Sequence, residues 1–168
     1  VVDIDSKSGI VNVVDPATKE ILVADKALTQ YFLMKFLRAR EGYNVLSYQY
    51  QYSTVARLLS SPTVYNNFRQ EFNDPNLSAR TKYRNDVADV RLRSLQFLGE
   101  IKLDGINDSY EAVQIRYTIF NPKNNVIWNN KIATIGYKYM TLELNNFERN
   151  INPLGFQVLR FDAANEIE

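Results

Sequence analysis

The spacing of apolar residues changes from a helical to a strand period near residue 87, and this change limits the possible folds more than any other feature. Before it, Val64, Phe68 and Phe72 recur at helical intervals. After it, apolar residues occupy every second position, as from 113 to 119 and from 133 to 139. Helices followed by an antiparallel sheet pack on one of its faces. We therefore predict one α+β domain over residues 1–168.

The N-terminal half is predicted to contain consecutive helices. They are expected at Lys26–Glu41, at 45–59 and from 62 to about 72. Asp25 suits the N-cap of the first helix, and Gly42 is expected to end it in a left-handed conformation. Ser61 suits the N-cap of the third helix, and Pro16 is expected to end regular structure near the N-terminus.

The C-terminal half is predicted to be an antiparallel meander. Strands are expected from 87, at 113–119, 128–139 and 155–161, with a short helix or loop at 142–150. The alternation changes parity near Ser94, which indicates a β-bulge, and Asn124 and Asn125 suit a hairpin turn. Two further β-like runs, 1–4 and 10–14, suit a small N-terminal hairpin.

The composition excludes much familiar chemistry. The 168 residues contain no histidine and no cysteine, which removes the commonest general base, metal ligand and thiol nucleophile. The six glycines stand singly, so there is no glycine-rich phosphate loop. No apolar run approaches the roughly 18 to 20 residues that cross a bilayer. We predict no catalytic residue, no cofactor and no metal, and interpret Asp3 with Asp5 and Asp104 with Asp108 as solvated turn residues.

Two alternatives keep a chemical role. An enzyme of this fold could use a buried Asp or Glu as a proton shuttle with a tyrosine as hydrogen-bond donor. A basic and aromatic cluster could contact nucleic acid, and its members are Arg80, Lys82, Tyr83 and Arg84. Because the formal net charge is only +1 and acidic residues flank this cluster, we interpret it as a solvated linker and expect no nucleic-acid partner.

The helix expected at Lys26–Glu41 is apolar over more than half of its circumference. Its large apolar residues are Leu28, Tyr31, Phe32, Leu33, Met34, Phe36 and Leu37. A helix with one buried face needs only a single apolar stripe. Part of this surface is therefore expected to be covered by the second helix or presented to another subunit.

Several motifs resemble one known family. The run at 31–43 (YFLMKFLRAREGY) and the box at 152–156 (NPLGF) resemble the VirB8 family of bacterial type IV secretion systems. LLSSP at 58–62, Trp128 and ATIGY at 133–137 lie between them in the order that this family shows. The resemblance covers nearly the whole chain.

The resemblance implies a nuclear-transport-factor-2-like fold, with the helices on a curved antiparallel sheet of about four strands. It also implies a non-enzymatic assembly component at the periplasmic face of the inner membrane, tethered by a cytoplasmic tail and one transmembrane helix that precede these residues. Such proteins self-associate, sometimes as weak homodimers, and contact other components of the secretion system.

The resemblance also assigns roles to particular residues. Leu28 and Tyr31 match positions of self-association, and Thr134 matches a position of partner contact, although it also fits an ordinary strand residue. The box comprises Asn152, Pro153, Leu154 and Gly155. Its proline fixes the backbone, its glycine permits a tight bend and its asparagine can cap neighbouring amides, so the box is expected to direct the last strand.

Overall fold

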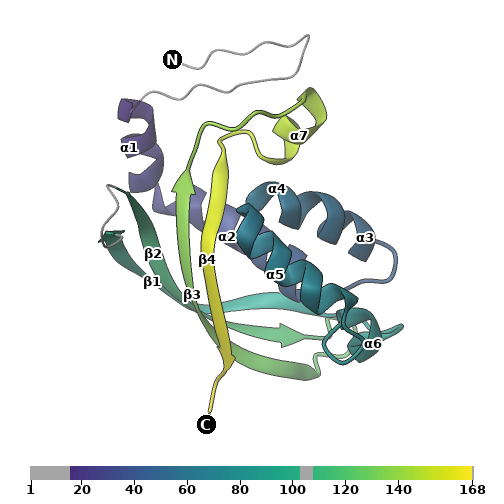
Figure 1. The fold of residues 1–168 in the computed structure, drawn as a ribbon. Coiled ribbons are helices and arrows are strands. Elements are labelled where there is room, and N and C mark those ends of the chain that lie inside the picture. The colour runs from purple at the N-terminus through teal and green to yellow at the C-terminus, as the bar shows by residue number, and fades with distance from the viewer. Residues whose placement is uncertain (1–15, 103–107, 168) are drawn as a thin grey trace.

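The computed structural model describes residues 16–102 and 108–167. All helices except α7 come before the first strand of an antiparallel sheet in the described part of the chain (Figure 1). The helical elements are α1 Pro16–Ala24, α2 Lys26–Glu41, α3 Tyr48–Tyr50, the π-helix η1 Gln51–Ala56, α4 Arg57–Leu59, α5 Pro62–Asn73, α6 Ala79–Tyr83 and α7 Asn146–Ile151. The strands are β1 Asp89–Lys102, β2 Ser109–Phe120, β3 Ile127–Tyr139 and β4 Phe156–Asn165. The predicted N-terminal hairpin lies outside the described residues.

The sheet has the order β1-β2-β3-β4, and every neighbouring pair is antiparallel. It is curved, and the longer helices gather on one side of it (Figure 1). The predicted bulge near Ser94 is confirmed by a register shift between Leu92 and Ser94, and a second shift lies between Phe97 and Gly99. The α+β prediction and the four-stranded antiparallel sheet are therefore confirmed.

Helix α2 is the central helix of the core. Asp25 Oδ1 accepts a hydrogen bond from the backbone N–H of Leu28 at 2.9 Å, which confirms the predicted N-cap. Gly42 ends the helix as predicted, but the predicted left-handed conformation was wrong, since its φ of −82° and ψ of 168° are extended. Glycine is needed there for space, because a Cβ would lie 2.6 Å from the carbonyl oxygen of Arg38.

Three other local predictions need correction. Pro16 begins α1 instead of ending regular structure, because a proline in the first helical turn loses no intrahelical hydrogen bond. The second helix begins at Tyr48, later than predicted, and passes through a π-helical stretch. Most of the basic cluster interpreted as a solvated linker lies on a short helix, α6, which is capped by Ser78 Oγ.

The core lies between the helices and the inward residues of the sheet. Leu33, Phe36 and Leu37 of α2 are fully buried, as are Ile115 and Ile135 of the facing strands. This burial places most of the apolar surface of α2 inside the domain. No helix in residues 16–102 and 108–167 is long and apolar enough to span a bilayer.

Candidate functional site

The exposed part of α2 is much smaller than its composition suggested. The second helical segment, at η1, covers one side of α2, and β1 packs on another part of it. Tyr31 remains 57% exposed, whereas Leu28, one turn earlier, is half-buried against the core. Lys35 lies over the Tyr31 ring at 5.7 Å from its centroid. Residues three apart share a helix face, so Leu28 and Tyr31 form one small surface patch.

Thr134 lies on the other face of the sheet. It belongs to β3, is half-buried, and pairs with Gln114 of β2 and Asp162 of β4. Its neighbours along the strand, Ala133 and Ile135, are buried on the helix side. Because successive strand residues point to opposite faces, Thr134 faces away from the helices and from the Tyr31 patch. The structure does not bring Thr134 together with Leu28 and Tyr31.

The box at 152–155 joins α7 to β4. Asn152 is fully buried and donates through Nδ2 to the carbonyl oxygens of Leu58, at 2.8 Å, and Phe156, at 2.9 Å. Its Oδ1 accepts a hydrogen bond from the Phe156 N–H at 3.0 Å. One side chain thus ties α4 to the start of β4.

The glycine of the box is required by its conformation and by its surroundings. Gly155 has a φ of +69°, and a Cβ there would lie 1.8 Å from the carbonyl oxygen of Met140. Pro153 is exposed, while Leu154 is half-buried against the core. The box therefore sets the direction of β4 through hydrogen bonding and close backbone approach.

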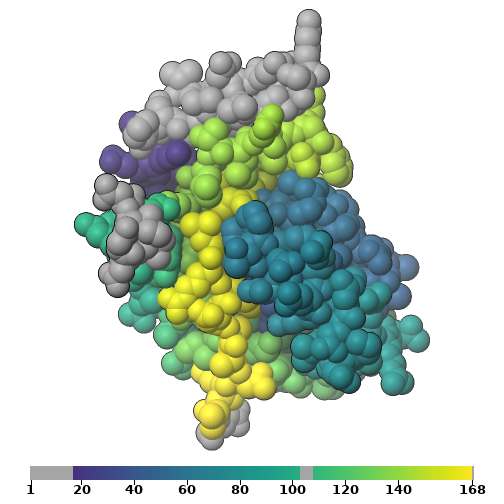
Figure 2. Space-filling view, in the orientation of Figure 1, coloured from purple at the N-terminus to yellow at the C-terminus, as the bar shows by residue number. Residues whose placement is uncertain are grey.

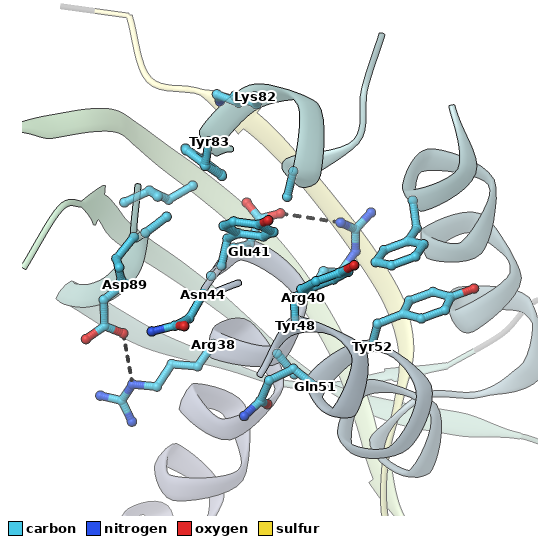
Figure 3. Close-up of a pocket in the computed structure, with 18 of the residues that line it drawn as sticks. Arg38, Arg40, Glu41, Asn44, Tyr48, Gln51, Tyr52, Lys82, Tyr83 and Asp89 are labelled. Atoms are coloured by element: carbon cyan, nitrogen blue, oxygen red, sulfur yellow. Dashed lines mark hydrogen bonds and ion pairs between the residues drawn. The ribbon is translucent and has the colours of Figure 1, made fainter. Parts of the chain in front are cut away.

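A cavity of about 370 Å³ opens between the C-terminal end of α2, α5, α6 and the sheet (Figure 3). Its walls are rich in aromatic side chains, and these include Tyr43, Tyr48, Tyr52, Phe68, Phe72 and Tyr83. Tyr52 stacks on Phe72 with ring centroids 3.7 Å apart. Lys82 lies on the wall and makes no ion pair with any residue in the described part of the chain.

A buried ionic cluster lies at the inner end of this cavity. Glu41 accepts hydrogen bonds from the Tyr117 hydroxyl at 2.8 Å and from Lys131 Nζ at 3.0 Å. Arg40 lies 3.4 Å from the same carboxylate and 2.9 Å from that of Glu71. The cluster connects the end of α2 to two strands and to α5.

The pKa values of this cluster argue against the enzymatic alternative. Burial by itself raises the pKa of Glu41, but the charges of Lys131 and Arg40 and the hydrogen bonds from Lys131 and Tyr117 lower it below its usual 4.5. Burial and the neighbouring Glu41 raise the pKa of the Tyr117 hydroxyl. A buried proton shuttle needs a carboxyl group whose pKa is raised toward neutrality. Glu41 has the buried carboxylate and the nearby tyrosine, but its pKa is lowered rather than raised.

This cluster was missed in the sequence analysis, although the sequence contains a signal for it. Glu41 continues the i, i+4 row Leu33–Leu37, which is fully buried. Lys131 occupies the inward row of β3, and Tyr117 occupies that of β2. A charged residue in an apolar row at each of two elements predicts a buried ion pair, because an unpaired buried charge is costly.

The other charged candidates are dispersed. Arg80 donates to the carbonyl oxygen of Phe72 at 3.0 Å, and Tyr83 is buried, so the basic cluster is not a continuous surface. Asp108 pairs with Lys138, whereas Asp3, Asp5 and Asp104 lie outside the described residues. Within residues 16–102 and 108–167, no group of three acidic side chains is placed to hold a metal ion.

Comparison with known sequences identifies the class of protein to which the chain is related. The chain is 31% identical over 173 residues to the type IV secretion system protein virB8 of Bartonella quintana, covering 99% of this chain and 68% of that protein. It is 30% identical to an uncharacterised protein of Rickettsia prowazekii, covering 94% of this chain but only 61% of that protein. The chain is thus related to a type IV secretion component and spans about two thirds of the length of these two relatives.

Comparison with solved structures leads to the same class of protein. The soluble domain of TrwG from Bartonella grahamii matches with a TM-score of 0.67 at 25% identity, over 86% of this chain and 98% of that one. VirB8 of Agrobacterium tumefaciens matches in fold with a TM-score of 0.64 at 22% identity, over 85% and 94% of the two chains. The family model described as VirB8 protein matches residues 1–166, and the chain belongs to this family. Its fold is the nuclear-transport-factor-2-like fold of VirB8 domains, as predicted.

Proposed function

We propose that this chain is the periplasmic assembly domain of an inner-membrane component of a type IV secretion system, and that it acts without catalysis. The observation that carries the proposal is the family match over residues 1–166. The lowered pKa of Glu41 and its ion pair with Lys131 support a structural role for this buried carboxylate, which lines the cavity. A transmembrane helix and cytoplasmic tail precede the domain in this proposal.

Self-association through Leu28 and Tyr31 is the second part of the proposal. It is supported by the exposure of Tyr31 on a helix whose other large apolar residues are mostly buried. Tyrosine is enriched at interfaces because it combines a large apolar ring with a polar end. Thr134 then faces a different partner, since it lies on the opposite side of the sheet.

Sedimentation of the wild type and Tyr31→Arg tests the self-association. A charge in a small apolar interface is expected to raise the dissociation constant at least tenfold without changing the melting temperature. Gln30→Arg is the matched control, because Gln30 is exposed one residue away on α2 and points in another direction. Identical sedimentation of wild type and Tyr31→Arg across a wide concentration range would remove α2 as the interface.

The whole proposal is tested in cells that contain the secretion system. Deletion of the gene is expected to abolish substrate transfer, and the wild type but not Tyr31→Arg is expected to restore it. A reporter enzyme fused to the C-terminus and active only in the periplasm is expected to be active. Normal transfer without the protein would contradict the assignment.

A further inference from the structure

The face of the sheet that points away from the helices carries a cluster of arginines. Val90 of β1 and Ile115 of β2 are buried on the helix side. Because successive strand residues point to opposite faces, Arg91 and Arg116 lie on the outer face. They are diagonal neighbours on the two strands, since Arg91 pairs with Thr118, two residues after Arg116.

Arg93 adds a third guanidinium to this face. It is the extra residue of the β1 bulge, and its side chain crosses the sheet. Its Nη2 lies 3.4 Å from the carbonyl oxygen of Tyr117 on β2 and 3.3 Å from that of Lys131 on β3, and it also donates to Glu166. Glu166 accepts a second hydrogen bond from Arg116 Nη1 at 2.9 Å. Two of the three arginines therefore share one carboxylate.

Most hydrogen-bond donors of the cluster are free. Arg91 is exposed and makes no ion pair within residues 16–102 and 108–167. Its guanidinium lies 4.1 Å from the centre of the Phe120 ring, and this stacking orients the guanidinium without using its N–H groups. Among the described residues, Arg93 donates only through Nη2 and Arg116 only through Nη1. Each guanidinium has five N–H donors in a planar fork that fits a carboxylate.

The acidic side chains of this face do not balance the cluster. Three arginines face the single carboxylate of Glu166, so positive charges exceed negative charges by two. Two other acids of the outer face, Asp89 and Asp162, have arginines of their own, which are Arg38 and Arg160. The excess positive charge fits an acidic partner.

The place of the cluster in the fold favours a protein partner over the membrane surface. Arg116 pairs with Ile132, which pairs with Ala164 near the end of β4. The last residues of β4 extend past the helices (Figure 2), and α1 lies at the opposite end of the molecule (Figure 1). In the proposed function the transmembrane helix precedes α1, so the cluster is at the end away from the membrane anchor. Three clustered arginines are also fewer than the basic stripe that nucleic-acid surfaces carry.

Thr134 lies beside the cluster. It is on the outer face and pairs with Gln114, which is two residues before Arg116 on β2. Thr134 and Arg116 are thus diagonal neighbours, and one bound segment can contact both.

We propose that the outer face of the sheet at Arg91, Arg93 and Arg116 binds an acidic segment of another secretion component, whose carboxylates accept hydrogen bonds from the free donors of these arginines. The inference rests on the proposed role in a secretion system and adds to it the chemistry of the partner at the Thr134 face. Glu166 then competes with the partner for Arg93 and Arg116.

Site-specific photocrosslinking in the full-length protein, in cells with the assembled system, tests this surface. Ser94 is exposed and pairs with Arg116 on the outer face, and Asn67 is exposed on α5 on the helix side. A benzoylphenylalanine at Ser94 is expected to form an adduct with another component, within a segment rich in Asp and Glu, and one at Asn67 is not. An adduct with a phospholipid, a nucleic acid or a second copy of this chain, equal adducts from Asn67, or no adduct would overturn the proposal.

Arg91→Glu tests the charge requirement, because Arg91 is exposed and has no ion pair to lose. The Ser94 adduct is expected to fall at least tenfold while the melting temperature stays the same. Arg69→Glu, which reverses an exposed charge on α5, is the matched control and should leave the adduct unchanged. Replacement of an acidic residue in the crosslinked segment by Arg is expected to restore the adduct of Arg91→Glu, which it could not do for an unfolded variant. An undiminished adduct in Arg91→Glu, or no restoration from any acidic position of the segment, would exclude the contact.

Glu166→Gln tests the competition in the opposite direction. Loss of this carboxylate frees donors of Arg93 and Arg116, so the Ser94 adduct is expected to increase several-fold. An unchanged or weaker adduct would exclude these two arginines from the contact. If transfer requires the protein but no Ser94 adduct forms, the outer-face surface fails alone. If transfer does not require the protein, the proposed function fails.

Discussion

Two carboxylates in this domain have similar partners but different surroundings. Glu41 lies between α2 and the sheet, 3.0 Å from Lys131, and Glu166 lies on the sheet beyond β4, 2.9 Å from Arg116 and in contact with Arg93. The partners differ in exposure, since Arg40 beside Glu41 is 8% exposed and Arg116 beside Glu166 is 48% exposed. The distances alone therefore do not show which ion pair stabilises the fold.

The two ion pairs differ in their access to solvent. Water screens the exposed pair and solvates either partner when the other is removed, so such pairs contribute about 0 to 1 kcal/mol. A buried charge that loses its partner has no such compensation, and breaking a buried pair costs about 3 to 5 kcal/mol. The predictions below test this contrast.

Glu41→Gln is expected to have the largest effect. It keeps the size of the side chain but leaves Lys131 without its acidic partner, so the free energy of unfolding should fall by about 3 kcal/mol. The value lies at the lower end of the range because Lys131 is 23% exposed and Arg40 keeps Glu71. Chemical denaturation of this variant and of Glu143→Gln, an exposed control, measures it. Equal losses in both variants would contradict the contrast.

The pH dependence of stability follows from the same carboxylate. The pKa of Glu41 in the folded state is below its usual 4.5, so its stabilising contribution is complete above about pH 4.5. It is lost as the pH falls through the folded-state pKa. The unfolding free energy of the wild type should therefore fall more steeply below pH 4.5 than that of Glu41→Gln. Parallel curves would show that Glu41 does not have a lowered pKa.

Tyr117→Phe removes one hydrogen bond from Glu41 and keeps the packing. The ring is fully buried and its hydroxyl donates to Glu41 at 2.8 Å. Hydrogen bonds to charged groups contribute about 1.5 to 3 kcal/mol, so the variant should lose about that much. Tyr31→Phe, which removes an exposed hydroxyl, should change the unfolding free energy by less than about 0.5 kcal/mol.

The sequence predicted the elements whose periodicity and caps are local. Asp25 at α2, the strands of the meander and the bulge near Ser94 were placed correctly, because these signals lie within a few residues. The end of α2 at Gly42 was also placed correctly, but the conformation of Gly42 was not predicted, because the need for glycine comes from the approach of the Arg38 carbonyl oxygen. Steric constraints of that kind appear only once the chain is folded.

The candidate site was harder to predict than the fold. The sequence singled out Tyr31, which the structure leaves exposed, but its apolar pattern could not show that the second helical segment and β1 cover the rest of α2. The Glu41 cluster joins residues 76 and 90 positions apart. Long-range pairing of this kind has no local sequence period.

Glu166→Gln should have the smallest effect and completes the comparison. The carboxylate is held by Arg93 and Arg116 on the sheet, and all three side chains contact solvent. The free energy of unfolding should fall by about 0.2 to 1 kcal/mol, and the loss should shrink further in 1 M salt, where charges are screened within roughly 3 Å. The loss from Glu41→Gln should change less with salt, because Glu41 is buried and Lys131 is only 23% exposed, so salt screens this pair less. A salt-independent loss of several kcal/mol from Glu166→Gln would mean that the two carboxylates stabilise the fold in the same way.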